Sequence, residues 1–168
     1  MGNITIYRYV VLLALFCAAI LSAAPAHAGH ISGTIRLDTP DGQTINGDWI
    51  RVLLTTAAVA PPNVPALDGL AALARYDRIV SAHMDFYVRY QQHLSQAGYL
   101  VASVLTDESG AFKFVDVVPG RYFIVVTFPS TVGGYKVAWQ VPVSVPATGD
   151  PASVSLDWHN MLLPTQKH

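Results

Sequence analysis

Hydrophobic and polar residues alternate with a period of two along most of this chain, a pattern typical of β-strands with one buried face. The runs are rich in β-branched and aromatic residues and are bounded by turn signals containing Gly, Pro, Asp or Ser. They span residues 30–37, 49–56, 99–106, 112–115, 121–128, 135–145 and 154–158. Short strands separated by turns predict a mainly β fold, a seven-stranded antiparallel Greek-key β-sandwich.

The period changes to that of a helix between the second and third of these runs. Apolar residues recur every three or four positions from Leu67 to about Ala97. Asp68 is the expected N-cap and Gly98 the expected C-terminal stop. We therefore expect one long helical insertion at about residues 57–98, inside a sandwich that otherwise forms a single domain over residues 29–168.

The apolar face of this helix is unusually rich in aromatic residues. Its candidate partner or ligand residues are Tyr76, His83, Phe86, Tyr87 and Tyr90. Aromatic side chains bury a large area at low entropic cost and are favoured at the centres of interfaces. Two interpretations stay open: the face packs on one sheet of the sandwich, or part of it receives a partner or a ligand.

The first residues predict export. Residues 10–24 are almost wholly apolar, follow Arg8, and precede Ala26-His27-Ala28, which has small residues where signal peptidase requires them. The apolar run is shorter than the roughly 20 residues of a membrane-spanning helix. We predict a signal peptide at residues 1–28 and a mature chain, without a membrane span, that is periplasmic or extracellular.

Charge and cysteine content narrow the function further. The chain has 10 Lys and Arg against 11 Asp and Glu, and no basic run, which argues against a nucleic-acid partner. Its one cysteine, Cys17, lies in the predicted signal peptide, so the mature chain is expected to have no disulfide and no cysteine-ligated metal. No cofactor or metal site is predicted. The turn residues Asp38, Asp41, Asp107 and Glu108 could gather around calcium, but solvated turn carboxylates are the favoured interpretation.

The turn and strand motifs together resemble a known family. Gly33-Thr34-Ile35, then Asp41 to Leu54 (DGQTINGDWIRVLL), then Thr106 to Phe114 (TDESGAFKF) and Val118 to Tyr122 (VPGRY) follow one another in the chain. This order is similar to that of the carboxypeptidase regulatory-like domains, whose fold is a transthyretin-like, or prealbumin-like, β-sandwich. The resemblance covers most of residues 30–56 and 99–158 and does not include the helical insertion.

The resemblance implies structural rather than catalytic roles for these motif residues. We expect no enzyme: the C-terminal end, Met161 to His168, lacks the pattern of hydroxyisourate hydrolase, and no G-x-S-x-G or H-E-x-x-H motif occurs. The leading hypothesis is an exported interaction module that binds another envelope or extracellular protein through the inserted helix or an open sheet edge. The alternative is a carbohydrate-binding module that presents Trp49, Trp139 or Trp158 to a polysaccharide. The oligomeric state stays open.

Overall fold

The structure is a computed structural model that describes residues 28–64 and 66–165. Of the predicted signal peptide, only Ala28 falls within this part of the chain. The described elements are β1 (Gly29–Asp38), β2 (Thr44–Asn46), β3 (Arg51–Thr55), α2 (Ala72–Leu94), β4 (Leu100–Leu105), β5 (Ala111–Val117), β6 (Gly120–Val126), β7 (Thr131–Val132), β8 (Tyr135–Lys136), β9 (Trp139–Val145), β10 (Ala152–Leu156) and the 3₁₀ helix η1 (Trp158–Asn160).

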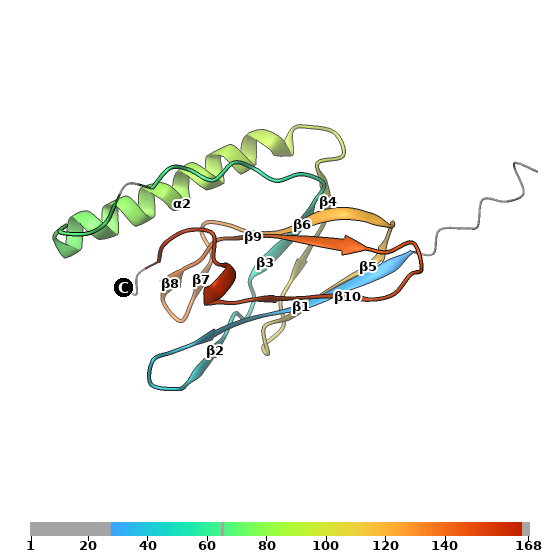
Figure 1. Cartoon of the computed structure of the whole chain (residues 1–168), viewed down its shortest axis with the longest axis horizontal. Helices are drawn as coiled ribbons and strands as arrows, with labels where there is room; N and C mark the ends of the chain where they lie inside the picture. Colours follow the sequence, from blue (N-terminus) through green and yellow to red (C-terminus); the bar gives the residue numbers. More distant parts are fainter. Residues whose placement is uncertain (1–27, 65, 166–168) are drawn as a thin grey trace, which may run out of the picture.

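The strands form two facing sheets, and the helix adds a third layer (Figure 1). One sheet has the order β4-β3-β6-β9. In the other, β1 is central: it pairs with β10 and β5 along its first half and with β2 along its second half. Strands β7 and β8 form a separate short hairpin. The chain is therefore mainly β, as the alternation predicted, with α2 between β3 and β4.

One pairing differs from the antiparallel sandwich that the sequence predicted. β1 and β10 run parallel, in a register from Ile31 with Ala152 to Ile35 with Leu156. The first and last strands thus lie side by side with the same direction, a relationship set by the path of the whole chain. Strands β2 and β7 lie between the predicted runs, and the predicted run 135–145 is divided into β8 and β9.

The space between the sheets is filled by the residues that the alternation placed on one side of each strand. Phe112 and Phe114 from β5 are buried, with their ring centroids 6.0 Å apart in an edge-to-face arrangement. Gly33 of β1 stands opposite Phe112, and a Cβ at Gly33 would lie 2.4 Å from the phenyl ring. Glycine is therefore required at position 33, because the Phe112 ring lies where a side chain would otherwise be.

The helix begins later than the sequence predicted. It starts at Ala72, with Ala71 at the N-cap making no side-chain hydrogen bond, so Asp68 is not the cap. Its C-terminal end follows the expectation more closely: Ser95 is the C-cap, and Gly98 has a φ of +77°. Glycine adopts this left-handed conformation without the steric cost of a Cβ, and here it turns the chain into β4.

Candidate interaction surface

Helix α2 packs against the outer face of the β4-β3-β6-β9 sheet, over residues of β3 and β6 (Figure 1). A second hydrophobic cluster forms between them, separate from the core of the sandwich. Its buried members include Phe86 and Tyr90 from the helix and Leu53 and Val125 from the sheet. Val59, which precedes α2 in the sequence, and Leu163, near the C-terminal end of the described chain, complete this cluster. The aromatic face is therefore largely a packing face.

The five candidate residues of this face fall into two groups. His83, Phe86 and Tyr90 are no more than 2% exposed, so their side chains offer no surface to a partner in this conformation. Tyr76 and Tyr87 are half-buried at one flank. There, the Tyr87 ring lies 6.0 Å from that of Phe128, and the Lys136 ammonium lies 6.0 Å from the Tyr76 ring centroid. The structure thus engages both tyrosines within the chain.

Burial also decides the chemistry of the titratable groups on this face. Burial is the main cause that lowers the pKa of His83, and Lys136 lowers it further, while a hydrogen bond to the Pro164 carbonyl opposes both effects. Burial raises the pKa of Tyr90 to about 12. Neither Nδ1 of His83 nor the Tyr90 hydroxyl has a hydrogen-bond partner. Both groups are uncharged at neutral pH, which suits a packed interior.

Asp107 and Asp38, two of the turn carboxylates, accept hydrogen bonds from nearby residues of the chain. Asp107 Oδ1 accepts hydrogen bonds from the Ser109 amide, the Ser109 hydroxyl and the Ala111 amide. These bonds, the Ser109 hydroxyl first, lower the pKa of Asp107. Asp38 accepts from the Thr44 hydroxyl. No group of three or more metal-ligating side chains gathers among residues 28–64 and 66–165.

The three tryptophans differ sharply in exposure. Trp139 is fully buried and donates from Nε1 to the Asp157 carbonyl. Trp158 is half-buried, packs edge-to-face on Tyr135 and donates to the Asp38 carbonyl. Trp49 is 64% exposed and has a φ of +56°, a left-handed conformation that is unusual for a bulky side chain. Of the three, Trp49 presents its ring to solvent.

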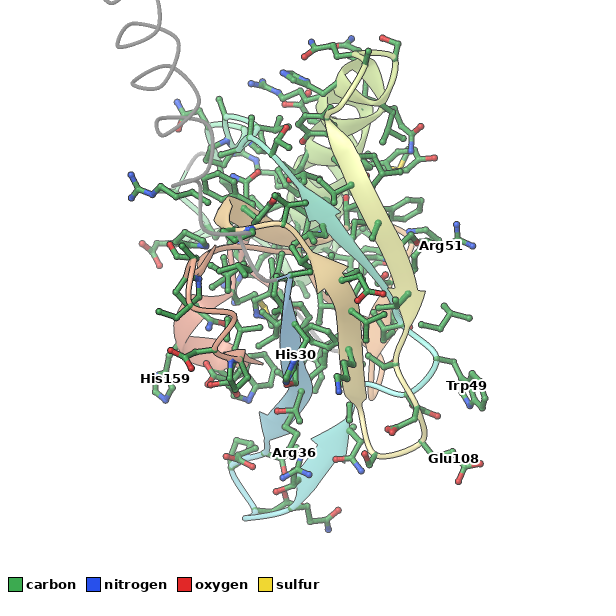
Figure 2. The ribbon with its side chains drawn as sticks, turned by 90° about the vertical axis from the view of Figure 1, so that its right-hand side faces the viewer. His30, Arg36, Trp49, Arg51, Glu108 and His159 are labelled. Carbon is green, nitrogen blue, oxygen red and sulfur yellow. The ribbon has the colours of Figure 1, made fainter. Side chains whose placement is uncertain are left out.

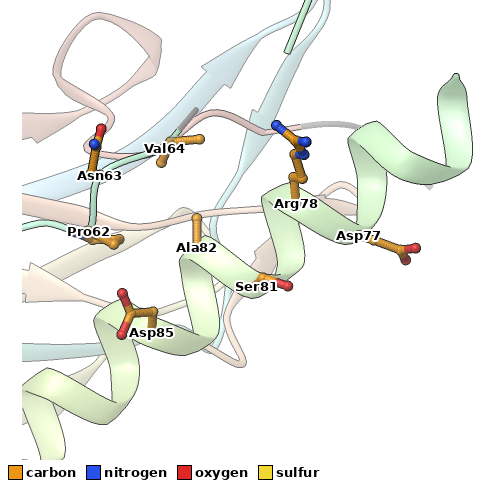
Figure 3. Close-up of a pocket in the computed structure, with 8 residues that line it drawn as sticks. All are labelled: Pro62, Asn63, Val64, Asp77, Arg78, Ser81, Ala82 and Asp85. Carbon is orange, nitrogen blue, oxygen red and sulfur yellow. The ribbon is translucent and has the colours of Figure 1, made fainter. Parts of the chain in front are cut away.

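Two hollows in the surface lack the features of a specific ligand site. The first, of about 380 Å³, runs between α2 and the segment 62–64 and is lined on the helix side by Asp77, Arg78, Ser81 and Asp85 (Figure 3). Asp85 is already paired with Arg89. The second, of about 460 Å³, lies over Ser32, Thr34, Ser153 and Ser155 on the outer face of β1 and β10. Neither has an exposed aromatic ring on which a sugar could stack.

The edge of strand β4 is the more distinctive surface. β4 pairs with β3 on one side and ends the sheet on the other. Its sequence from Leu100 to Leu105 (LVASVL) contains no charge, proline or glycine. Leu100, Val101 and Leu105 are 41%, 45% and 54% exposed. A sheet edge of this kind presents unpaired backbone groups and apolar side chains, which makes it a site for pairing with another strand.

Other edges of the sandwich carry features that oppose such pairing. β9 has Pro142 in its middle, which removes a backbone donor. β5 has the exposed Lys113 and a left-handed Asp116, with a φ of +55°, which twists its end. Strand β10 is shorter than β4 and follows Pro151. The contrast singles out β4, because proteins commonly block open edges with charges, prolines and kinks.

Side chains that rim the β4 edge project from the same side of the molecule. Figure 2 shows Trp49, Arg51 and Glu108 pointing outward beside β4. Arg51 pairs with Leu105 in the β3–β4 ladder, and the Ile50 carbonyl accepts from the Thr106 amide just beyond it. An apolar strand edge with an exposed aromatic and two opposite charges at its rim has the composition of an interface.

Sequence reasoning named an open sheet edge but placed its candidate residues on the helix. The run YLVASVLT has the composition of any buried strand, so its position at an edge depends on the order of strands in the sheet. The available signal was the absence of charge in this run, set against Pro142 in β9 and Lys113 in β5. This contrast becomes informative once the edges are known.

Comparison with solved structures returned β-rich proteins at low identity. A Pseudomonas aeruginosa protein provisionally described as carbohydrate binding is 15% identical, with a TM-score of 0.42, over 82% of this chain and 93% of that one. The minor pilin GBS52 of Streptococcus agalactiae is 12% identical, with a TM-score of 0.44, over 78% of this chain and 44% of that one. The major pilin SpaD of Corynebacterium diphtheriae is 11% identical, with a TM-score of 0.41, over 78% of this chain and 30% of that one.

This chain thus spans less than half of either pilin. Comparison with protein-family models gave no match, and neither did comparison with curated proteins. At these identities and TM-scores the likeness carries no information about function. No helix in the described part of the chain is long and apolar enough to cross a membrane.

Proposed function

We propose that this chain is an exported, non-catalytic β-sandwich module of the carboxypeptidase regulatory-like type, which mediates protein–protein interaction or assembly in the cell envelope or outside the cell. The observation that carries the proposal is the open, uncharged edge of β4 with its exposed Val101 and Leu105. Pairing along such an edge needs no preformed pocket, because backbone groups supply the hydrogen bonds and alternate side chains supply the selectivity.

The titratable groups support a non-catalytic role. The groups with shifted pKa are His83, Tyr90, Tyr99 and Asp107. The pKa shifts of His83, Tyr90 and Tyr99 are caused chiefly by burial. The shift of Asp107 is caused chiefly by the hydrogen bonds of its turn. An active site usually combines such a shift with access to a substrate, whereas the side chains of His83 and Tyr90 are enclosed.

The test is capture of a partner with a variant of the edge and a matched control. Ser103 is exposed in the middle of β4, so Ser103→Lys places a charge on the edge without entering the core. Ser153→Lys makes the same change on the exposed face of β10. We expect a crosslinked partner from the native envelope to be captured by the wild type and by Ser153→Lys but lost with Ser103→Lys. Equal capture by all three folded forms would contradict the proposed surface.

A second candidate function, carbohydrate binding, is favoured by one observation. Trp49 exposes its indole ring in a strained left-handed backbone conformation, and such strain often marks functional positions. Binding of a polysaccharide at this ring would quench its fluorescence, while the buried Trp139 would be unaffected. Quenching that disappears in Trp49→Phe would support this function. Unchanged wild-type fluorescence across a panel of envelope polysaccharides would count against it.

A further inference from the structure

The two ends of the insertion that carries α2 meet on the sheet. Thr55 pairs with Leu100 in the β3–β4 ladder, and the Thr56 amide donates a hydrogen bond to the Tyr99 carbonyl at 3.0 Å. The chain thus leaves the sheet and returns to it on neighbouring strands, at adjacent positions. Helix α2 can therefore move without separating any two strands of the sandwich.

A glycine with open surroundings lies at each end of α2. Gly69 precedes the helix with a φ of +73°, and Gly98 follows it with a φ of +77°. A Cβ at either position would meet no atom within 4 Å beyond its chain neighbours. The chain before Gly69 is anchored, because Val59 makes two backbone hydrogen bonds with the Gln140 side chain of β9. The two glycines therefore lie where hinges of the helix would be, since small residues often absorb a change in backbone dihedral angles.

The core of the sandwich is separate from the cluster beneath α2. Strands β3 and β6 contribute to both of them, because successive side chains of a strand point to opposite faces of the sheet. Val52 and Ile124 pack between the two sheets, whereas Leu53 and Val125 pack under the helix. Movement of α2 away from the sheet would therefore expose the second cluster and leave the core of the sandwich packed.

The layer under α2 also encloses polar groups that lack hydrogen-bond partners. The Tyr90 hydroxyl and Nδ1 of His83 are both buried without a partner. In the core of the sandwich, by contrast, the Tyr122 hydroxyl donates to the Val118 carbonyl at 2.8 Å. A buried polar group without a partner favours an open state, in which water solvates it, by roughly fivefold to 100-fold. The closed position of the helix is thus opposed by an effect that the Tyr122 hydroxyl does not exert on the core of the sandwich.

We propose that α2 is a lid, which opens and closes about Gly69 and Gly98 on the outer face of the β4-β3-β6-β9 sheet while the sandwich stays folded. The inference goes beyond the proposed function and does not depend on it. Opening uncovers Leu53, which pairs with Ser103 of β4 in the sheet. An open lid thus enlarges the apolar surface beside the β4 edge, and a closed lid reduces it.

Native-state hydrogen exchange tests the lid, because each amide reports the free energy of the easiest opening that exposes it. After correction for intrinsic rates, the amides of α2 should exchange as one group, about tenfold or more faster than the hydrogen-bonded amides of β6. Their exchange should also depend less steeply on urea, because opening of the lid exposes less surface than global unfolding. Equal protection and equal urea dependence of α2 and β6 would overturn the lid.

Two matched tyrosine variants separate the lid from the sandwich. Tyr90→Phe removes the unpartnered hydroxyl, so the amides of α2 should exchange roughly fivefold to 100-fold more slowly. Tyr122→Phe removes the hydrogen bond to Val118, which should speed exchange in β6 roughly fivefold and leave exchange in α2 unchanged. If Tyr122→Phe instead speeds exchange in α2 and β6 by the same factor, the helix and the sandwich open as one unit and the proposal fails. Equal or faster exchange of α2 in Tyr90→Phe would likewise count against it, because the hydroxyl would then not oppose the closed position.

Discussion

The Nε2–H group of His83 donates a hydrogen bond to the carbonyl oxygen of Pro164 at 3.0 Å, tying the middle of helix α2 to the C-terminal end of the described chain. The two residues are far apart in sequence, and the same segment sends Leu163 into the cluster beneath the helix. The helix is therefore held between the sheet below and the C-terminal segment beside it. The hydrogen bond places the imidazole ring of His83 in this structural role, and burial of the ring favours its neutral form.

We predict that burial of His83 makes the stability of the protein decrease as the pH falls below about 7. The pKa of His83 is lowered in the folded protein, chiefly by burial and further by Lys136, so as pH falls below the ordinary value of about 6.5 the unfolded chain takes up a proton first. The free energy of unfolding then decreases. Thermal denaturation should give a lower Tm at pH 5 than at pH 7.5.

The variant His83→Gln keeps a donor near the Pro164 carbonyl and should flatten this dependence. His159→Gln, a change at an exposed histidine of η1, should retain it. Asp107, whose pKa is lowered by the Ser109 hydroxyl and by the Ser109 and Ala111 amides, contributes stability that is lost at pH values below about 4. A Tm slope between pH 5 and 7.5 that is equal in wild type and His83→Gln would refute the assignment to His83.

The packing of α2 on the sheet predicts a large cost for removing the ring of Phe86. This side chain is fully buried between the helix and the strands, so Phe86→Ala should lower the free energy of unfolding by about 3–5 kcal/mol. Val88→Ala, on the same helix but 46% exposed, should change it by less than about 0.5 kcal/mol. Chemical denaturation of both variants measures the difference. Similar losses would mean that the helix face is not packed as described.

Residues whose role depends on local pattern were the ones that sequence reasoning placed well. Phe112 and Phe114 lie in the run 112–115, which the alternation predicted to be a strand with one buried face, and both are buried; His83, Phe86 and Tyr90 lie on the apolar side of the helix. The interpretation of that helix face could not be decided from its pattern, because a face that packs on a sheet and a face that binds a partner have the same spacing. Burial decides it.

Features that depend on long-range strand order were missed. The parallel pairing of β1 with β10 joins the two ends of the described sandwich, and no local alternation specifies a strand's neighbour or direction. The position of β4 at the edge of its sheet could not be predicted for the same reason. The start of α2 was missed because Asp68 is a favourable N-cap by type, yet the chain enters the helix through Ala71 without any side-chain cap.

The hydroxyl of Thr106, at the start of the turn between β4 and β5, predicts a further effect on stability. Thr106 is buried, donates to the Gly47 carbonyl at 2.6 Å and accepts from the Ile50 amide at 2.8 Å. Thr106→Val keeps the shape but leaves both backbone groups without a partner, which should cost about 2–4 kcal/mol. Thr106→Ser retains the hydroxyl and should cost about 1 kcal/mol for the lost methyl group. Equal losses for the two variants would show that the hydrogen bonds contribute little.

Gly110 and Gly42 allow backbone strain to be separated from steric overlap. Both have a left-handed backbone, with φ of +78° and +80°. A Cβ at Gly110 would lie 2.4 Å from the Ile35 carbonyl oxygen, whereas a Cβ at Gly42 would meet nothing within 4 Å. The Ile35 carbonyl accepts a hydrogen bond from the Gly47 amide, and the Ile35 amide donates one to the Gly110 carbonyl. An alanine at position 110 would thus disturb the contact between the β5 turn and the central strand.

Gly42→Ala should therefore cost only the left-handed conformation, about 1 kcal/mol. Gly110→Ala should cost the same amount plus roughly 1–3 kcal/mol for the overlap with the Ile35 carbonyl. Urea denaturation of the two variants gives the difference directly, because the strain common to both cancels. Equal stability of Gly110→Ala and Gly42→Ala would mean that the β4–β5 turn can move away from β1 at little cost. The close approach of Gly110 to Ile35 would then contribute little to holding this turn against β1.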